Sequence, residues 1–244
     1  RELVYIIIRN LIIALSISLL IIISKPLLLN ILNQVYDVST QSKNLIYEYI
    51  SIRVYSAPAE LIGYVLVGFY LGIQRTVISS LLIIILSLLN IILSIYFVNE
   101  LNLDVSGVAL GSVIAAYLTI ICFSIYTYYF IIGKFNLIPR FNTKTIFNIR
   151  KIFKLLNINF NIFIRTILLT LSFFWITYLG STLGEEYVAV NAVLLQLIFI
   201  SSFFLDAYAF STEGIIGYSL GKRSTKMFMS ATKNSLILSF CTGI

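Results

Sequence analysis

The sequence predicts an all-α, polytopic membrane protein, and three observations carry that prediction. Of the 244 residues, 59% are hydrophobic and 11% are charged, and the mean hydropathy is +1.00. Apolar runs recur along the chain, and several reach the roughly 20 residues that a membrane-spanning helix needs. The runs are unbroken, whereas strands of a membrane β-barrel alternate apolar and polar residues. A soluble globular domain and a barrel are therefore both excluded.

The first expected span covers residues 3–32. Lys25-Pro26 marks its far end or a kink, because proline lacks the N–H that a helix interior requires. Residues 33–47 are polar and are expected to form a loop, with a short helix at the membrane interface as the alternative. The second span covers residues 49–73 and contains Pro58, whose effect on a membrane helix is again a kink.

Two opposite charges lie in the first half of the second span. Arg53 and Glu60 are seven residues apart, so on a helix they share a face but are separated by two turns. One interpretation is a charge network beside a cavity. The other is that Arg53 extends to the membrane surface while Glu60 has a structural partner. The sequence leaves both open.

The third and fourth spans cover residues 77–98 and 105–132. The third contains one strongly polar residue, Asn90, with Ser94 one turn later. An Asn in this setting either joins two helices, an interaction worth about 1 kcal/mol, or lines a cavity. The fourth span opens with a run of small residues that includes Ser112 and permits close helix packing.

Residues 133–157 form the longest polar connection, which contains six basic residues and no acidic one. Apolar residues interspersed among the basic ones after Ile146 predict an amphipathic helix on the membrane surface. A basic segment between two spans is typical of a cytoplasmic loop, and it is not expected to bind nucleic acid.

The fifth and sixth spans cover residues 158–180 and 187–221. A second basic loop comes next over residues 221–234, and a seventh apolar run begins near Ser235. We therefore expect six complete spans and part of a seventh. Because both ends of the sequence lie beside apolar runs, we expect it to be an internal piece of a longer chain.

The sixth span contains two carboxylates, Asp206 and Glu213. They are seven residues apart, so a helix places them on one face. A charge inside the hydrocarbon costs roughly 2.5–3.5 kcal/mol at the centre of a helix, and intramembrane acids usually face a protein interior or an aqueous cavity. The functional interpretation is a proton or cation site in a transport pathway. The structural alternative is a pair of polar residues satisfied by neighbours near a helix end.

The charges of the loops alternate along the chain. Loops 74–76, 133–157 and 221–234 carry only basic charges, whereas loops 99–104 and 181–187 carry only acidic ones. The loop over residues 33–48 is mixed, with Lys43 against Asp37 and Glu48. Cytoplasmic loops are enriched in Lys and Arg, so the basic set is expected in the cytoplasm. The alternation supports the number of spans independently of hydropathy.

The chain contains no histidine, so the paired histidines of an intramembrane metalloprotease are lacking. We expect neither an enzyme nor a cofactor or metal site. A channel stays open as an alternative, although no repeated filter motif is present.

Taken in order, the spans resemble the helices of the multidrug and toxic compound extrusion (MATE) family, and most closely its DinF-like subfamily. The similarity covers nearly the whole chain and rests on five segments, which resemble the fourth to eighth helices of that family: residues 53–76, 90–93, 107–117, 163–166 and 205–213.

This resemblance implies a fold of twelve helices in two six-helix lobes, of which the chain holds helix three to the start of helix nine. Residues 1–132 would belong to the amino-terminal lobe, residues 133–157 to a cytoplasmic linker, and residues 158–244 to the carboxy-terminal lobe. The family exports organic solutes, often cationic and amphiphilic, in exchange for H⁺ or Na⁺. A flippase for lipid-linked saccharides, from the same superfamily, is the alternative.

The resemblance also implies site residues and a setting. Asp206 and Glu213 would couple ions or bind substrate, with Asn90 and Ser112 in the pocket of the amino-terminal lobe. Ser94 stands where related transporters often have an Asp, and the family's main coupling acid lies on helix one, outside this sequence. Arg53 and Glu60 complete the set of candidates. The expected setting is a monomer among lipids of the bacterial cytoplasmic membrane.

The loop charges lead to a first prediction, which concerns orientation. In a chain without its own cysteines, a Cys at Thr143 should resist a membrane-impermeant thiol reagent in intact cells, because a basic loop stays in the cytoplasm. A Cys at Asn102 should react with the reagent. The opposite labelling of these two positions would reverse the orientation.

Overall fold

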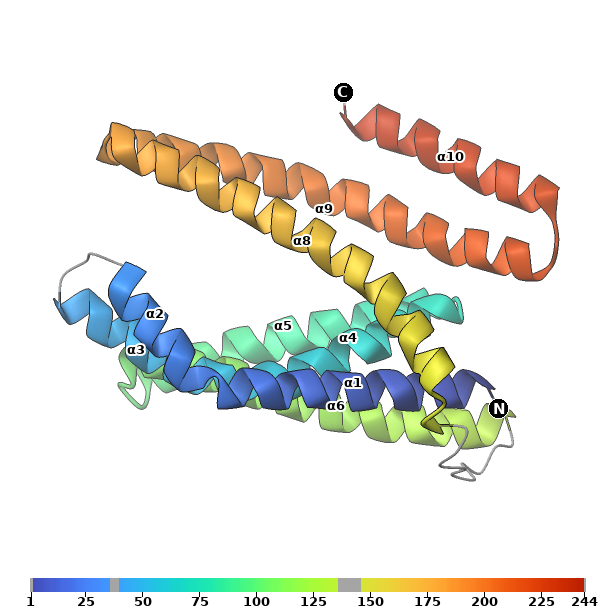
Figure 1. The fold of residues 1–244 in the computed structure, drawn as a ribbon, viewed down its shortest axis with the longest axis horizontal. Helices are drawn as coiled ribbons and strands as arrows, with labels where there is room; N and C mark the ends of the chain where they lie inside the picture. The colour runs from blue at the N-terminus through green and yellow to red at the C-terminus, as the bar shows by residue number, and fades with distance from the viewer. Residues whose placement is uncertain (1, 36–39, 136–145, 244) are drawn as a thin grey trace. The chain divides into compact units, whose positions relative to one another are not determined.

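The computed structural model describes residues 2–35, 40–135 and 146–243, and no strand occurs among them. Six of its helical segments are long and apolar enough to cross a membrane. The prediction of an all-α, polytopic membrane protein is therefore confirmed. The chain divides into two compact units, Arg1–Ile146 and Phe147–Ile244, and helices α1–α6 and α8–α10 of these units are labelled in Figure 1.

The first expected span is a helix broken near its far end. Helix α1 (Glu2–Ile23) and helix α2 (Lys25–Val35) are separated by a turn at Ser24. The backbone carbonyl of Ser24 accepts a hydrogen bond from the N–H of Leu28 at 3.0 Å, so helical bonding resumes within one turn. Pro26 is the second residue of α2, where a backbone N–H is not needed. The interruption at Lys25-Pro26 is thus a kink.

The second span is longer than predicted at its start. Helix α3 (Thr40–Arg53) leads through a 3-10 turn (Val54–Ser56) into helix α4 (Ala57–Gly72), with Pro58 in the first turn of α4. Residues 33–35 end helix α2 and residues 40–47 begin helix α3, so a loop is wrong for these residues and the helical alternative agrees with residues 40–47. Their polarity indicated contact with water, and a solvated segment can still be a helix. Residues 36–39 lie outside the described residues.

The third and fourth spans form a closely packed helix pair. Helix α5 (Thr76–Asn99) and helix α6 (Asp104–Phe135) agree with the predicted spans to within a few residues. The predicted small-residue face of α6 is buried, because small side chains let the two backbones approach. Its buried members are Gly107, Ala109, Gly111, Ser112, Ala115 and Ala116.

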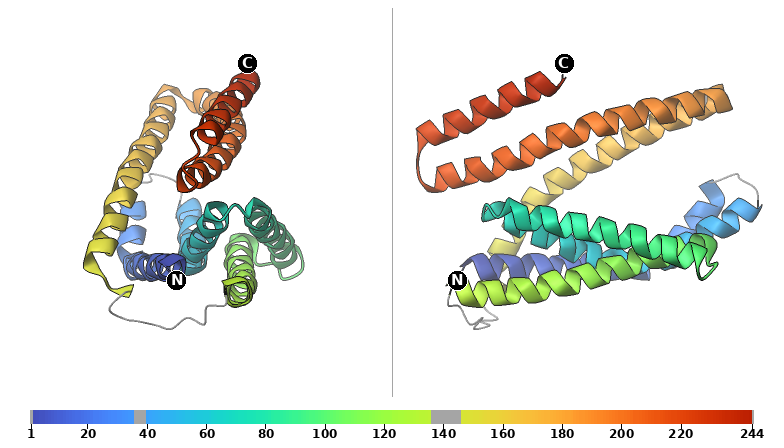
Figure 2. Two further views of the ribbon diagram at one scale, coloured as in Figure 1. Left: turned by 90° about the vertical axis from the view of Figure 1, so that its right-hand side faces the viewer. Right: turned by 180° about the vertical axis from the view of Figure 1, so that it is seen from behind.

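Two apolar clusters hold unit 1 together. One joins the start of α1 to the ends of α4 and α6, and its centre is Tyr70, which is fully buried and shares a 2.8 Å hydrogen bond with Thr127. The other joins α4, α5 and α6 around Leu66, Leu82 and Ile120. The views from two further sides show α4, α5 and α6 running alongside one another (Figure 2). These clusters place the polar residues of α5 and α6 in contact.

Unit 2 consists of helix α8 (Ile149–Leu183), helix α9 (Glu185–Gly221) and helix α10 (Thr225–Gly243). The predicted surface helix after Ile146 is wrong as a separate element, since residues 149–157 are the first turns of α8 itself. The basic loop predicted over residues 221–234 is also shorter, because only residues 222–224 are not helical. Lys and Arg favour helices, so a basic segment that joins an apolar run can extend its helix.

Two turns in the chain have the same construction. After α4, Gln74 adopts φ 58°, and after α9, Arg223 adopts φ 53°. In the first turn the N–H of Arg75 donates to the Tyr70 carbonyl at 2.8 Å; in the second, the N–H of Ser224 donates to the Ser219 carbonyl at 3.0 Å. This pattern is the Schellman motif that closes many helices. The two turns are Leu-Gly-Ile-Gln-Arg-Thr (71–76) and Leu-Gly-Lys-Arg-Ser-Thr (220–225).

Unit 2 buries few of its apolar side chains. Among its described residues only Ser219 is buried, and large apolar side chains such as Trp175, Leu194 and Phe203 are exposed. A water-soluble domain does not expose such a surface. A surface of this kind suits contact with lipid or with other membrane helices. The protein is thus an integral membrane protein.

The close approach of α5 and α6 leads to a prediction on stability. A Cβ atom added at Gly111 would lie 2.7 Å from the Ser94 hydroxyl oxygen and 2.8 Å from its backbone nitrogen. Gly111→Ala should therefore lower the free energy of unfolding by about 1–3 kcal/mol, as overpacking does. The measurement is the fraction of protein that stays monodisperse in detergent after heating.

The matched control for this prediction is Gly133→Ala on the same helix, where an added Cβ would meet no atom within 4 Å. This variant should keep or slightly raise the stability, since Ala favours helix. Equal heat sensitivity of the two variants would show that the approach of the helices at Gly111 does not limit stability.

Candidate functional site

Three predicted site residues meet at the interface of α5 and α6. The side-chain amide of Asn90 donates a hydrogen bond to the Ser112 hydroxyl at 3.1 Å, and the Ser94 hydroxyl donates to the Asn90 amide oxygen at 3.1 Å. Ser112 in turn donates to the backbone carbonyl of Val108 at 3.0 Å. The orientation of the Asn90 side chain is therefore set from both of its ends.

The burial of these three residues shows what the contact does for the fold. Ser112 is buried, with 7% of its surface exposed, and Asn90 and Ser94 are half-buried. A polar group that leaves water without a partner is costly, so their mutual bonds stabilise the helix pair. The structure thus provides the helix-joining contact. A role of the three residues in lining a cavity stays a prediction.

Arg53 and Glu60 form an ion pair within unit 1. The Arg53 Nη1 atom contacts both the Glu60 carboxylate and the Ser56 hydroxyl. The two charged side chains are each about one-third exposed, at 31% and 32%. A long arginine side chain can therefore bridge the two turns that separate the pair. The ion pair supplies Glu60 with a partner, which fits both interpretations, and a functional role of the pair stays a prediction.

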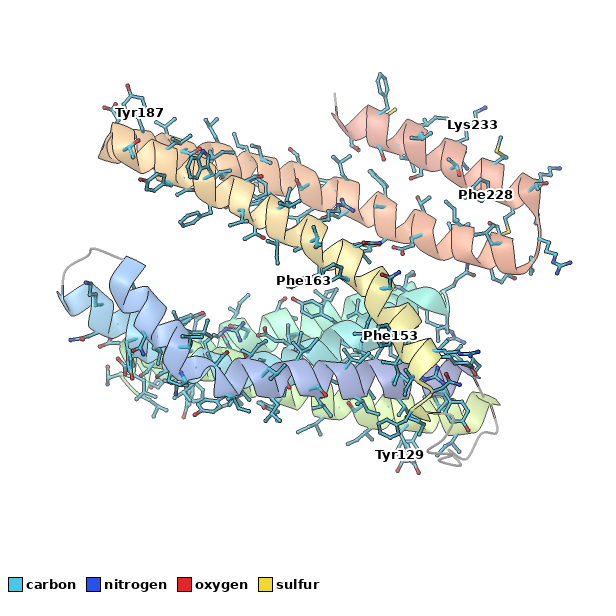
Figure 3. The ribbon with its side chains drawn as sticks, in the orientation of Figure 1. Tyr129, Phe153, Phe163, Tyr187, Phe228 and Lys233 are labelled. Carbon is cyan, nitrogen blue, oxygen red and sulfur yellow. The ribbon has the colours of Figure 1, made fainter. Side chains whose placement is uncertain are left out.

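Asp206 and Glu213 lie on helix α9, and both are exposed in unit 2. Phe199 lies seven residues before Asp206, on the same stripe, and its ring packs edge-on against Phe173 of α8 with centroids 5.3 Å apart. The stripe that carries both acids therefore starts at the contact between α8 and α9. The two helices lie close near Tyr187 and diverge toward the other end of α9 (Figure 3). Neither acid has an ion-pair or hydrogen-bond partner among the described residues.

One charged residue in the first span, Arg9, is an unpredicted part of the packing. Arg9 of α1 is only 2% exposed; its Nε donates to the backbone carbonyl of Ile146 at 3.0 Å, and its Nη1 lies 3.2 Å from the Glu2 carboxylate. The signal was present, since Glu2 and Arg9 are opposite charges seven residues apart. Arg9 thereby joins the start of α1 to the last residue of unit 1.

One short pattern in the sequence bears on enzyme function. Residues 217–221 have the spacing Gly-x-Ser-x-Gly, which marks the nucleophile of many hydrolases when it forms a sharp strand-to-helix turn. Here the pattern lies inside helix α9, and Ser219 is buried and donates to the Ile216 carbonyl at 2.8 Å. The described residues also contain no His, Cys, Asp and Glu cluster that could hold a metal ion. Ser219 is thus a packing residue of the helix end.

Two hollows lie between neighbouring helices of the described units. A groove of about 480 Å³ lies between α1 and α4, and Asn10 is the polar residue of its otherwise apolar wall. A hollow of about 280 Å³ lies between α9 and α10, where the Thr212 and Ser235 hydroxyls are 2.6 Å apart. Neither hollow is lined by Asp206 or Glu213.

The fold and these contacts define the class of protein. Apolar helices that carry carboxylates, ion pairs and hydrogen-bonded amides inside their spans are typical of polytopic proteins with a polar pathway. Residues 162–244 match the MatE family. The chain belongs to this family.

Two relatives extend the match over most of the chain. The DNA damage-inducible protein F of Escherichia coli (strain K12) is 34% identical over 175 residues, which are 72% of this chain and 38% of that protein. The Protein DETOXIFICATION 43 of Arabidopsis thaliana is 26% identical over 199 residues, which are 81% of this chain and 36% of that protein. The chain thus spans well under half the length of either relative. No solved structure matches it significantly.

The contact at Asn90 leads to a prediction on stability. Asn90→Leu removes both of its hydrogen bonds, so the free energy of unfolding should fall by about 0.6–2 kcal/mol, the range found for polar contacts between membrane helices. The measurement is a thermal denaturation curve in detergent. Ser87→Ala on the same helix is the control, because Ser87 is exposed. An Asn90→Leu protein as stable as the Ser87→Ala protein would mean that the contact does not hold the helices together.

Proposed function

We propose that the protein contributes to a secondary active exporter, which moves cationic or amphiphilic organic solutes out of the cell in exchange for H⁺ or Na⁺. Such exporters expose a central site to one side of the membrane and then to the other, as two lobes rock against each other. Membership of the MatE family supports this proposal, and so does the word detoxification in the name of the plant relative.

The observation that carries the proposal is the pair of acids on α9. Asp206 and Glu213 lie in a helical segment that is apolar enough to span a membrane. The opposite charges of Arg53 and Glu60, also seven residues apart, satisfy each other. Two acids with the same spacing repel each other, so they need cations from elsewhere. A proton, a sodium ion or a cationic solute would meet that need.

The two acids would have different roles. Asp206 lies further than Glu213 from Lys222, which comes directly after the end of α9. If the basic loops are cytoplasmic, Asp206 lies deeper in the membrane and is the stronger candidate for coupling or substrate binding. Glu213 would be its partner nearer the cytoplasm. Asn90, Ser94 and Ser112 would contribute polar contacts in the other lobe. The site would work without a cofactor, in a monomer of the bacterial cytoplasmic membrane.

A lipid-linked saccharide flippase is a weaker candidate for a specific reason. Binding a pyrophosphate would need several free basic side chains within the spans. Arg53 is paired with Glu60, and Arg9 is buried against Glu2 and a backbone carbonyl. Among the basic side chains inside the described spans and away from helix ends, only Arg165 has a charge free to bind an anion. The paired arginines therefore favour the exporter of cationic solutes.

The acids on α9 lead to a prediction on transport. Asp206→Asn keeps the size of the side chain and removes its charge, so efflux of a cationic dye from vesicles should fall at least about tenfold. That fall corresponds to the loss of about 1.4 kcal/mol of interaction. Glu213→Gln should have a smaller effect. The measurement uses the full-length protein in vesicles under an imposed proton or sodium gradient, at external pH 6 to 8.

The control for this prediction is Glu186→Gln. Glu186 is an exposed acid in the first turn of α9, outside the candidate site. This variant should transport like the parent, and all variants should reach the membrane in equal amounts. If Asp206→Asn and Glu213→Gln both transport like the parent over the whole pH range, the acids are structural and the proposed exchange mechanism fails.

A further inference from the structure

The charges inside the spans share a common pattern with one exception. Glu2 with Arg9, and Arg53 with Glu60, are opposite charges seven residues apart, and each pair makes contact. The third pair, Asp206 and Glu213, has the same spacing but like charges. An unpartnered charge in a span is costly. The two acids of α9 therefore need a basic partner from another helix, and α8 packs against α9.

Arg165 is a basic side chain on α8. It lies in the middle third of the 35-residue helix α8. It is exposed, and like Asp206 it has no ion-pair or hydrogen-bond partner among the described residues. It lines a shallow hollow along α8 together with Asn161 and Ser172.

The contacts between α8 and α9 set the register of the two helices. Phe173 packs against Phe199, and Gly180 lies against Asn191, whose side-chain amide would be 3.7 Å from a Cβ on that glycine. In both contacts the residue numbers sum to nearly the same value, as expected for two antiparallel helices. This register allows the level of every other residue along the pair to be found.

Arg165 and Asp206 lie at the same level in this register. Arg165 is eight residues before Phe173, or about 12 Å along α8, and Asp206 is seven residues after Phe199, or about 10.5 Å along α9. Glu213 lies about 10 Å further on, at the level of residue 158. Asp206 is therefore the carboxylate that Arg165 can reach.

Both side chains also point to the same side of the helix pair. At about 100° per residue, Asp206 falls within about 20° of the stripe that carries Phe199, while Arg165 lies on the flank beside Thr166. Because the two helices are antiparallel, the angular offset of Asp206 from Phe199 and that of Arg165 from Phe173 point to the same side of the helix pair. The two helices diverge with distance from Tyr187 (Figure 3), and no ion pair joins Arg165 to Asp206 in this structure, so the pair would require the helices to come closer.

We propose that Arg165 is the internal counter-ion of Asp206. When α8 and α9 approach, the Arg165 guanidinium and the Asp206 carboxylate form an ion pair, and a cationic solute or coupling ion has to displace Arg165 to reach the acid. This proposal rests on the proposed role of Asp206 as a cation site. Arg165 is then a positioning residue that keeps Asp206 paired between transport cycles and selects for cations able to compete with a guanidinium.

The test is a cysteine crosslink one turn from the pair. Leu169→Cys on α8 and Ser202→Cys on α9 occupy one level in the same register and leave both charges in place. The two native cysteines, Cys122 and Cys241, are first replaced by Ser. Without a transported cation, the crosslink should form readily in membranes. Arg165→Gln and Asp206→Asn should each lower its rate about fivefold, as for an ion pair worth about 1 kcal/mol.

A charge exchange and a control make the test decisive. The double variant Arg165→Asp with Asp206→Arg restores opposite charges and should restore the crosslink. Arg150→Gln changes an exposed arginine in the first turn of the same helix and should leave the rate unchanged. The proposal is overturned if Arg165→Gln crosslinks like the parent, or if the charge exchange stays as slow as the single variants.

The crosslink separates this proposal from the proposed function. Crosslinking needs no transport, so the ion pair can be present in a protein that does not export the dye. If the pair forms but excess cationic dye does not slow the crosslink, the dye does not displace Arg165. The proposed competition between the dye and Arg165 for Asp206 is then overturned. If Asp206→Asn abolishes export while Arg165→Gln changes neither crosslink nor export, the acid works without Arg165.

Discussion

Unit 1 depends on one constraint, which is that a charge inside an apolar span is costly without a partner within reach. Arg9 satisfies it twice, with the Glu2 carboxylate and the Ile146 carbonyl. Because Ile146 ends unit 1, this single side chain ties the first helix to the point where the chain leaves the unit. Arg53 and Glu60 satisfy the same constraint within one span. The packing of unit 1 and its charges therefore form one system.

The uncharged polar residues obey the same constraint with smaller energies. Gly111 lets α6 approach the α5 backbone at Ser94, whose hydroxyl donates to the Asn90 amide oxygen. The cluster around Tyr70 then joins the carboxy-terminal parts of α4 and α6, where the Tyr70 hydroxyl is hydrogen-bonded to the Thr127 hydroxyl. Unit 2 lacks such buried contacts among its described residues. The acidic side chains of α9 are therefore held less firmly by neighbouring residues than the polar side chains of α5.

Hydropathy was sufficient to predict the helices, because length and apolar content decide whether a segment can cross a membrane. Helix ends were predicted less well: residues 40–47 and 226–234 are polar yet helical, since polarity reports exposure to water and not backbone conformation. Spacing alone placed Ser94 one turn from Asn90, whereas the meeting of Asn90 with Ser112 on the next helix was expected only from the resemblance to the MATE family. The contact of Arg9 with Ile146 could not be predicted, because no local pattern links residues 137 positions apart.

The two matching turns, at residues 71–76 and 220–225, have a consequence for the ancestry of the chain. Four spans lie between them, on α5, α6, α8 and α9. A gene segment that begins and ends in the same turn with an even number of spans can be copied without inverting the later helices in the membrane. The four-span segment from α5 to α9 is thus a natural unit of duplication, and a lineage could lengthen such a protein by this segment while its orientation was preserved.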